Sequence, residues 1–351
     1  MAFISFNPTD HFSPKIYTGT GSTQTISGFG FEPSVTWIKD RGTGNSHDIY
    51  DSVRGAGKRI RPASTVVEND RSGTDSVSAW TSDGFTLIGA NGANNESGLN
   101  YATWNWKMGT TSGITTNGST NITPLGYSFN ATAGQSIIHY NGNQTAGDKV
   151  PHGLGVKPEL IIIKDLDAEN SWHVYHKSHG ATKYMLLNTN ESVNTNTNRW
   201  NDTEPDSVNF TLGSTAAVNG NDNNYIAYCF AEKKGYSRFG TFTGTGQLDA
   251  PFIPLGFRAA FFMYKRVDAA AHWTFHTNKI DGYNEVTKSI NANEDNAEST
   301  STGDNDIDIC ASGVKLREDN THINASGASY IYIAFAESPF VSSEGVPCTA
   351  R

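Results

Sequence analysis

Histidines gather most densely in one short segment of the chain, which carries His173, His176 and His179. Imidazole nitrogens are common zinc ligands, so this segment is the first candidate for a metal site. On a β-strand, however, residues three positions apart point to opposite faces, and His173 and His176 could not converge on one ion. We therefore predict no metal site here and expect these histidines to face solvent or to lie at strand ends.

Acidic residues alternate with other residues in two segments, Asp165–Glu169 and Asp304–Asp308. An EF-hand calcium loop needs glycine at its sixth position and glutamate at its twelfth. Counted from Asp165, these positions hold Asn170 and His176, and the second segment is not completed either. We predict no cofactor; a structural Ca²⁺ is compatible with these acids, but no complete motif supports it.

Two tryptophans stand beside histidines near expected loops, Trp172 next to His173 and Trp273 next to His272. An exposed aromatic ring beside a polar group can stack against the C–H face of a sugar. These four residues are therefore our candidate ligand-binding residues. The alternative for any tryptophan is a place in the core, which we expect for Trp37.

No arrangement typical of catalysis is evident. The sequence has no Gly-x-Ser-x-Gly nucleophile elbow and no recognisable Cys/His nucleophile pair. Carboxylates are numerous, but sequence alone cannot place two of them at the separation that glycoside hydrolysis requires. The distinctive residues also recur along the chain, which indicates packing. We predict that the protein is not an enzyme and assign no catalytic residue.

The charge and hydropathy of the chain limit the kinds of partner that we expect it to bind. Its 351 residues carry a net charge of −9, which argues against general nucleic-acid binding. No apolar run approaches the roughly 20 residues that span a bilayer, so we expect no membrane insertion. The first residues do not resemble a signal peptide, and the three cysteines do not form a disulfide pattern, which favours synthesis in a cytoplasm.

One sequence pattern occurs three times. Gly30–Lys39, Gly155–Lys164 and Gly256–Lys265 share a Gly-to-Lys offset of nine, and a Tyr follows Lys39 and Lys164 by eleven residues. In the third copy we align Phe275 with these tyrosines, one residue nearer its Lys. Each copy opens with a strand and a glycine-rich turn and closes with an aromatic strand, and the closing strands begin at Tyr101, Tyr225 and Tyr330. Near-constant spacing of several anchors indicates a triplication.

The repeat predicts an all-β protein of three tandem β-sandwich domains of the jelly-roll or lectin-like type. Short apolar or alternating runs are separated by Gly, Asn, Asp and Ser, and little helix is expected. The expected segments are an N-terminal arm at 1–13, a first repeat at 14–109, a linker or extended strand pair at 110–134, a second repeat at 135–235, a third repeat at 236–340 and a C-terminal tail at 341–351. Asn-rich stretches at 89–98, 188–202 and 291–306 are expected to be surface loops.

The first copy resembles a repeat domain found in marine tailed bacteriophages. The resemblance rests on the motifs at Gly30–Arg41, Tyr50–Gly55, Ser82–Leu87 and Trp104–Lys107, and it weakens in the second and third copies. The family is similar to concanavalin A-like lectin sandwiches and occurs in virion structural proteins, often tail-fibre or adsorption proteins. It brings no catalytic residues.

The resemblance implies a structural protein on the exterior of a phage particle, with tail or fibre association and host attachment favoured. Capsid decoration or a head fibre is one alternative, and a glycan-binding module or glycan-cleaving enzyme is another. Expected partners are other virion proteins, a host surface glycan bound by the three Asn-rich loops, and further copies of the chain in a homo-oligomer. The expected location is the virion, assembled in the host cytoplasm.

Overall fold

A computed structural model describes residues 6–341 and 345–351. Their regular structure is almost entirely antiparallel β-sheet, which confirms the predicted all-β sandwich class. Helix in the described residues is limited to a 3₁₀ turn, η1 (Pro8–Asp10), and one short α-helix, α1 (Ala216–Asn219). No helix among them has the length and apolar character to cross a membrane. Residues 1–5 of the predicted arm and 342–344 of the predicted tail lie outside the described residues.

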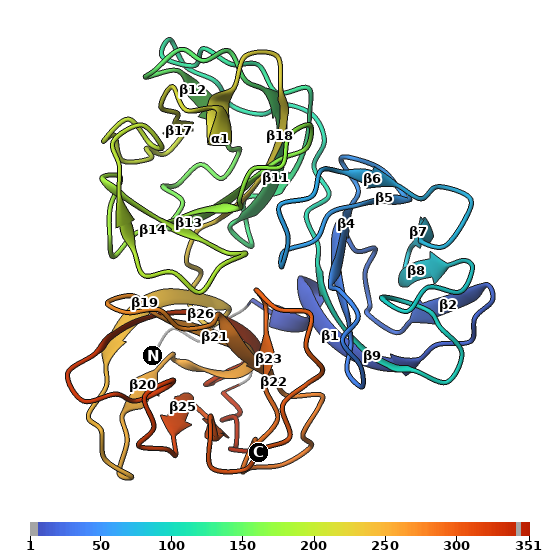
Figure 1. The fold of residues 1–351 in the computed structure, drawn as a ribbon, viewed down its shortest axis with the longest axis vertical. Helices are drawn as coiled ribbons and strands as arrows, with labels where there is room; N and C mark the ends of the chain where they lie inside the picture. Colours follow the sequence, from blue (N-terminus) through green and yellow to red (C-terminus); the bar gives the residue numbers. More distant parts are fainter. Residues whose placement is uncertain (1–5, 342–344) are drawn as a thin grey trace.

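Three lobes of similar construction surround a common centre (Figure 1). Lobe 1 contains the strands β1 to β9 at residues 12–106, lobe 2 contains β10 to β18 at 126–230, and lobe 3 contains β19 to β26 at 237–339. Each lobe has an inner sheet toward the centre and a smaller outer sheet.

The inner sheets share one strand order, in which the closing strand of the repeat lies between its opening strand and its Gly-to-Lys strand. The orders are β1-β9-β3-β4, β10-β11-β18-β13-β14-β15-β16 and β19-β26-β21-β22-β23. The strands are β1 (Phe12–Thr18), β3 (Val35–Asp40), β4 (Asp48–Asp51), β9 (Asn100–Trp106), β10 (Gly126–Asn130), β11 (Gln135–Asn141), β13 (Leu160–Asp165), β14 (His173–His176), β15 (Lys183–Leu186), β16 (Asn194–Thr195), β18 (Asn224–Phe230), β19 (Ser237–Thr243), β21 (Phe257–Arg266), β22 (Thr274–Thr277), β23 (Ile290–Asn291) and β26 (Ser329–Pro339).

The outer sheets are ordered β2-β8-β7, β12-β17 and β20-β25-β24, and lobe 1 has a further two-stranded ribbon, β5-β6. Their strands are β2 (Gln24–Ser27), β5 (Lys58–Arg59), β6 (Asn69–Asp70), β7 (Val77–Thr81), β8 (Gly84–Leu87), β12 (Lys149–Pro151), β17 (Asn209–Thr211), β20 (Phe252–Pro254), β24 (Ile307–Cys310) and β25 (Gly313–Leu316).

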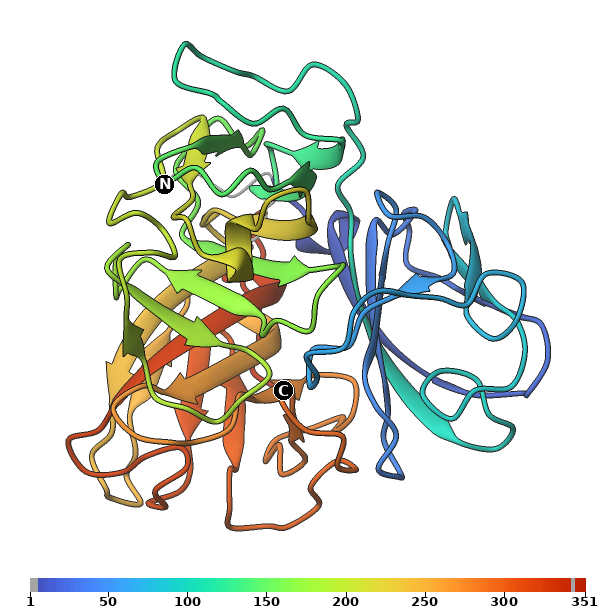
Figure 2. The same cartoon turned by 45° about the horizontal axis from the view of Figure 1, so that its top comes forward.

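The inner sheets are buried on both faces. Their outward faces pack against the outer sheets in three separate cores, one in each lobe. Their inward faces join in a single core to which all three lobes contribute, and Figure 2 shows the sheets of lobes 2 and 3 lying against each other. Burial on both faces explains why the Gly-to-Lys segments are nearly continuous apolar runs rather than alternating ones.

The registers of the inner sheets place the three repeats in exact correspondence and correct one alignment. Trp37 pairs with Ile49, Ile162 with Val174, and Met263 with Phe275. Phe275 therefore corresponds to Val174. His276 lies eleven positions after Lys265 and corresponds to Tyr50 and Tyr175. The third copy keeps the same offset, and aligning Phe275 with the tyrosines was wrong.

The segment predicted as a linker or an extended strand pair, 110–134, contains both connecting chain and a strand. Residues 126–130 form β10, which pairs with β11 at the edge of the second inner sheet. Ile122 is buried in the outer core of lobe 2. Phe129 and Tyr127 lie in β10 and contact each other, so this stretch has enough bulky side chains to form a strand despite its Gly- and Ser-rich composition.

The glycine-rich turns after the opening strands have a steric cause. A Cβ atom at Gly19, Gly142 or Gly244 would lie 2.3, 2.3 or 2.2 Å from a backbone oxygen of the loop that precedes the closing strand. Only glycine allows the two segments to approach so closely. The glycine that follows each opening strand is therefore a packing feature common to the repeats.

Candidate functional site

The same backbone hydrogen bond recurs where each lobe meets the next. Its donor and acceptor are Glu68 N and Leu166 O at 3.0 Å, Val193 N and Val267 O at 2.9 Å, and Glu298 N and Arg41 O at 3.0 Å. Each acceptor lies two residues after the conserved lysine of its repeat. The lobes therefore contact one another head to tail, and the ring of three closes within one chain.

A buried aromatic ring reinforces each junction. The indole nitrogens of Trp172 and Trp273 each donate at 2.9 Å, to Arg61 O and Leu186 O of the preceding lobe. At the equivalent position of lobe 1, His47 Nε2 lies 3.1 Å from Asn291 O of lobe 3. Each ring buries apolar area and also makes a polar contact with a backbone carbonyl of the neighbouring lobe.

Three of the four candidate sugar-binding residues are therefore structural. Trp172 is 0% exposed, Trp273 is 1% exposed and His173 is 3% exposed, so no sugar can stack on them. The prediction was wrong for these residues because a tryptophan beside a loop has the same local sequence whether solvent or a second repeat covers it.

In lobe 1, histidine takes the place of tryptophan, and the facing strand compensates. The residue opposite Ile49 is Trp37, whereas lobes 2 and 3 have the smaller Ile162 and Met263 there. Trp37 Nε1 donates to His47 Nδ1 at 2.9 Å, so His47 carries its proton on Nε2, which faces Asn291 O and Glu294 O. Burial lowers the pKa of His47 to about 3, which keeps the ring neutral.

The lysines that end the Gly-to-Lys motif are buried at the junctions. Lys39, Lys164 and Lys265 are each 0% exposed. Lys39 donates to Asp295 O in lobe 3 at 3.2 Å, and Lys265 donates to Asn190 O in lobe 2 at 3.3 Å. Burial lowers the pKa of each lysine to about 8. Lys164 donates to carbonyls of its own lobe, Asp165 O and Ala168 O, so the motif lysines bond the neighbouring lobe at two of the three junctions.

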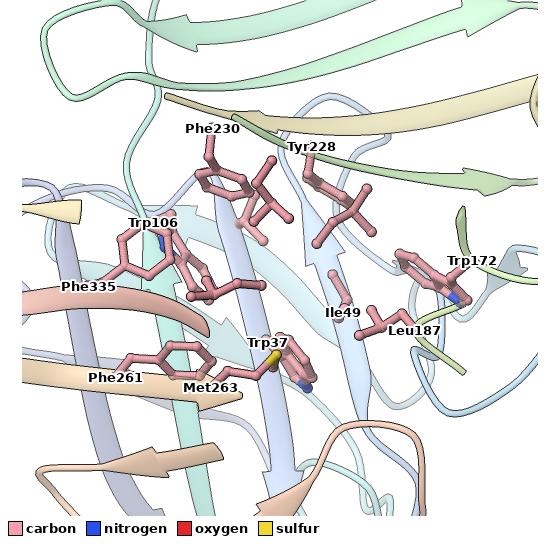
Figure 3. Close-up of a pocket in the computed structure, with 14 residues that line it drawn as sticks. Trp37, Ile49, Trp106, Trp172, Leu187, Tyr228, Phe230, Phe261, Met263 and Phe335 are labelled. Carbon is pink, nitrogen blue, oxygen red and sulfur yellow. The ribbon is translucent and has the colours of Figure 1, made fainter. Parts of the chain in front are cut away.

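The centre of the ring is apolar. One aromatic residue from the same position of each closing strand, Trp106, Phe230 and Phe335, meets the other two with ring centroids 5.5–6.5 Å apart. Figure 3 shows these side chains converging on a cavity of about 60 Å³. This volume is far below the roughly 300 Å³ at which small-molecule sites begin, and apolar side chains line it, so we assign it to packing.

The histidine cluster does not form a metal site. His173 and His176 stand at the two ends of β14, as expected, but both are buried instead of facing solvent. His173 stacks on Tyr184, and His176 Nδ1 lies 2.7 Å from the Ser178 hydroxyl. Burial lowers the pKa of both histidines to about 3. Among the described residues, no group of converging metal-binding side chains includes them.

His272 alone among the candidate residues lines an open pocket, which we call the loop pocket. Its Nδ1 lies 3.0 Å from the Asn293 amide nitrogen and 3.3 Å from a Glu294 carboxylate oxygen. The pocket has a volume of about 250 Å³ and is lined by His272, Thr274, Ser289, Asn291, Asn296, Ala297, Ser299, Asp304, Asn305 and His322. Amides, hydroxyls and imidazoles in such a hollow can exchange hydrogen bonds with a polyhydroxylated ligand.

Two of the three predicted contact loops are junction elements instead of free loops. Loop 188–202 supplies Asn190 O and Val193 N to lobe 3. Loop 291–306 supplies Glu298 to Arg41 of lobe 1, with the guanidinium bound to the carboxylate at 2.7 and 3.0 Å. Contacts with a neighbouring repeat therefore occupy part of each loop, while other residues of 291–306 line the loop pocket.

The third loop, 89–98, is held by an asparagine that sequence reasoning missed. Asn95 accepts from Thr20 N and donates to Ser22 O and Gly89 O. Asn219 and Asn324 make the same three kinds of bond in lobes 2 and 3. Each stands six residues before the tyrosine that begins the closing-strand motif, a spacing that was readable in the sequence.

Comparison with known proteins gives one match. The family described as a domain of unknown function, DUF7483, matches residues 7–339. The chain belongs to this family. The match spans all three lobes, in agreement with the central core that they share. No curated protein and no solved structure matches the chain significantly.

Proposed function

We propose that this protein is a structural component on the exterior of a tailed phage particle, associated with the tail or its fibres, where it binds a host surface glycan. The observation that carries the binding role is the loop pocket, a polar hollow lined by amide, hydroxyl and imidazole groups on a lobe whose sandwich is firmly packed. The resemblance of the first repeat to phage virion domains supports the virion setting.

The arrangement of the lobes also supports a structural role. Most ionisable side chains at the junctions are in hydrogen bonds or ion pairs that hold the ring together, as Lys39 and Arg41 are. Binding sites on rigid scaffolds lose little conformational entropy when a ligand binds. Many copies on one particle would then strengthen weak binding at each pocket, whether the chain forms its own oligomer or joins other virion proteins.

Capsid decoration is the second candidate, and the pseudo-threefold ring favours it. A body with three equivalent lobes can contact three equivalent subunits around a threefold position. One chain with three repeats would then occupy a place that a homotrimer can also fill. A tail fibre of three chains offers the same symmetry, so the ring is compatible with both locations.

Labelled antibody on intact virions tests the proposal. We expect label on the tail or its fibres. Label over the icosahedral head would replace the tail assignment with capsid decoration, and a particle without label would refute the virion role.

Glycan binding has a separate test on the purified protein, which uses a glycan array with the H272A variant and the matched control D249N. Asp249 is an exposed acid in the same lobe and does not line the loop pocket. We expect H272A to lower binding at least about tenfold and D249N to leave it unchanged. Equal binding by both variants would exclude the loop pocket, and hydrolysis of an arrayed glycan would favour the glycan-cleaving alternative.

A further inference from the structure

Three carboxylates converge at one edge of the outer sheet of lobe 3. Oxygens of Glu285, Asp306 and Glu318 all lie within 4.8 Å of one another. Like charges so close together are unfavourable unless something compensates them.

Asp306 is the buried member of the group. It is 2% exposed, and its Oδ1 has no hydrogen-bond partner among the described residues. Its other oxygen accepts one bond, from Gly303 N at 2.9 Å. An ionised carboxylate that is buried with an unsatisfied oxygen is costly, because neither water nor a donor replaces its lost hydration.

The backbone fixes all three groups in place. Asp306 immediately precedes β24, and Glu318 follows β25, its partner in the outer sheet. Glu285 lies between Asn284, whose side chain bonds both the N–H and the C=O of Ile309, and Val286, which forms a β-bridge with Ile307. The convergence is therefore set by paired backbone and does not depend on flexible side chains alone.

The nearby basic side chains are already paired with other acids. Arg317 binds Asp308 at 2.6 Å, and Lys315 binds Asp249 at 2.6 Å. No ion pair joins a lysine or arginine to any of the three carboxylates within residues 6–341 and 345–351. The part of the chain that the structure describes therefore supplies no direct cationic partner to the cluster.

The other two lobes lack this concentration of negative charge. The bond from Arg317 N to Asp306 O corresponds to those from Ile88 N to Ser76 O in lobe 1 and from Gly213 N to Arg199 O in lobe 2. Lobe 1 therefore has the neutral Ser76 at the position equivalent to Asp306. Lobe 2 has the cationic Arg199 there, and its guanidinium lies over the ring of Tyr184. The acidic group is a specific feature of lobe 3 and is not required by the repeat fold.

We propose that Glu285, Asp306 and Glu318 bind a divalent metal ion, with Ca²⁺ as the best fit. Carboxylate oxygens are the ligands that hard cations prefer. Three oxygens no more than 4.8 Å apart can share a point that lies about 2.8 Å or less from each, a range that includes the 2.3–2.6 Å of Ca²⁺ coordination. Ca²⁺ accepts irregular shells of oxygen ligands, whereas Mg²⁺ demands a near-ideal octahedron at 2.0–2.1 Å, so Ca²⁺ fits better a set of three carboxylates whose places the backbone fixes. Water can complete the shell because Glu285 is exposed.

Calorimetric titration of the EDTA-stripped protein with CaCl₂, combined with thermal unfolding, tests the site. We expect one site, and a rise in Tm of about 3–6 °C at a Ca²⁺ concentration 100-fold above Kd. Tyr264 bonds the side chain of Asn305, next to Asp306, so bound Tb³⁺ should show tyrosine-sensitised luminescence that Ca²⁺ displaces. Absence of binding at millimolar Ca²⁺ would overturn the proposal, and binding of Mg²⁺ alone would overturn the choice of calcium.

The variant D306S introduces the residue that lobe 1 has at this position. We expect it to abolish the response to Ca²⁺ and, in EDTA, to unfold at the same temperature as the parent protein or a higher one, because the buried charge is gone. E285Q alters only an exposed side chain and should weaken binding at least about tenfold even if D306S does not fold. E32Q, which alters an exposed carboxylate of lobe 1, should bind Ca²⁺ as the parent does. A response retained in both D306S and E285Q would place the ion elsewhere and refute this site.

Discussion

The most informative test of the junctions replaces Trp37 and His47 of lobe 1 by the residue types that lobe 3 has at these two positions. Lobe 1 pairs Trp37 with His47, whereas lobe 3 has Met263 and Trp273 at the same two positions. The two rings of lobe 1 lie 5.7 Å apart between centroids and share a hydrogen bond. We predict that W37M and H47W are each destabilising but largely compensate each other when combined.

The magnitudes follow from packing. W37M leaves a cavity and removes the donor to His47 Nδ1, which should cost about 2–4 kcal/mol of unfolding free energy. H47W forces a second indole against the first, and overpacking of this kind costs about 1–3 kcal/mol. In the double variant the introduced indole can donate to Asn291 O, as Trp172 and Trp273 donate to their acceptors. The double variant should therefore be more stable than the sum of the single changes predicts, by at least about 2 kcal/mol.

Urea unfolding of the four proteins, followed by circular dichroism, measures this coupling. Additive free energies would refute the equivalence of these positions in the ring. The combination T25S/T86S provides the matched control, since these residues bond each other on the exposed outer sheet of lobe 1, away from any junction.

Three further predictions concern stability. Burial lowers the pKa of several histidines to about 3 or 4, so that they are neutral in the folded protein; they are His47, His152, His173, His176 and His276. On unfolding below about pH 6.5, each of them takes up a proton. Stability should therefore be complete above that pH and fall by about 1.4 kcal/mol per pH unit for each histidine as the pH drops toward 4. Urea unfolding between about pH 7.5 and 4.5 checks this slope, and a flat profile would contradict it. N95A should cost about 2–4 kcal/mol in urea unfolding, and N95D should not restore it, because two of the lost bonds need the amide as donor. E298A should cost about 2–3 kcal/mol because it leaves the partly buried Arg41 unpaired, whereas E191Q on an exposed loop should be neutral in the same assay.

The parts of the fold that local sequence determines could be predicted. Continuous apolar runs identified the inner strands as buried on both faces, and the offset between glycine and lysine identified the repeats. The glycine-rich openings were also recognised, and their cause is a backbone oxygen only 2.3 Å from where a Cβ of Gly19 would lie. The alignment of the third copy failed by one residue because Phe275 resembled the tyrosines more than His276 did.

The contacts between repeats could not be predicted. Trp172 and Trp273 have the local sequence of exposed loop residues, but the neighbouring lobe covers them. The acidic segment Asp304–Asp308 included Asp306, but Glu285 and Glu318 lie more than ten positions from it, so the sequence did not reveal the group of three. Residues that are distant in the sequence become neighbours only when sheets pair and lobes pack.

Small-angle X-ray scattering tests the closed ring most directly. A compact particle of this length has a radius of gyration of about 20 Å, whereas three lobes of about 100 residues arranged in a line give about 28 Å. The account predicts the smaller value for the monomer, with a pair-distance distribution that shows one compact body. A value near about 28 Å would mean that the junctions at Trp172, Trp273 and His47 do not hold in solution.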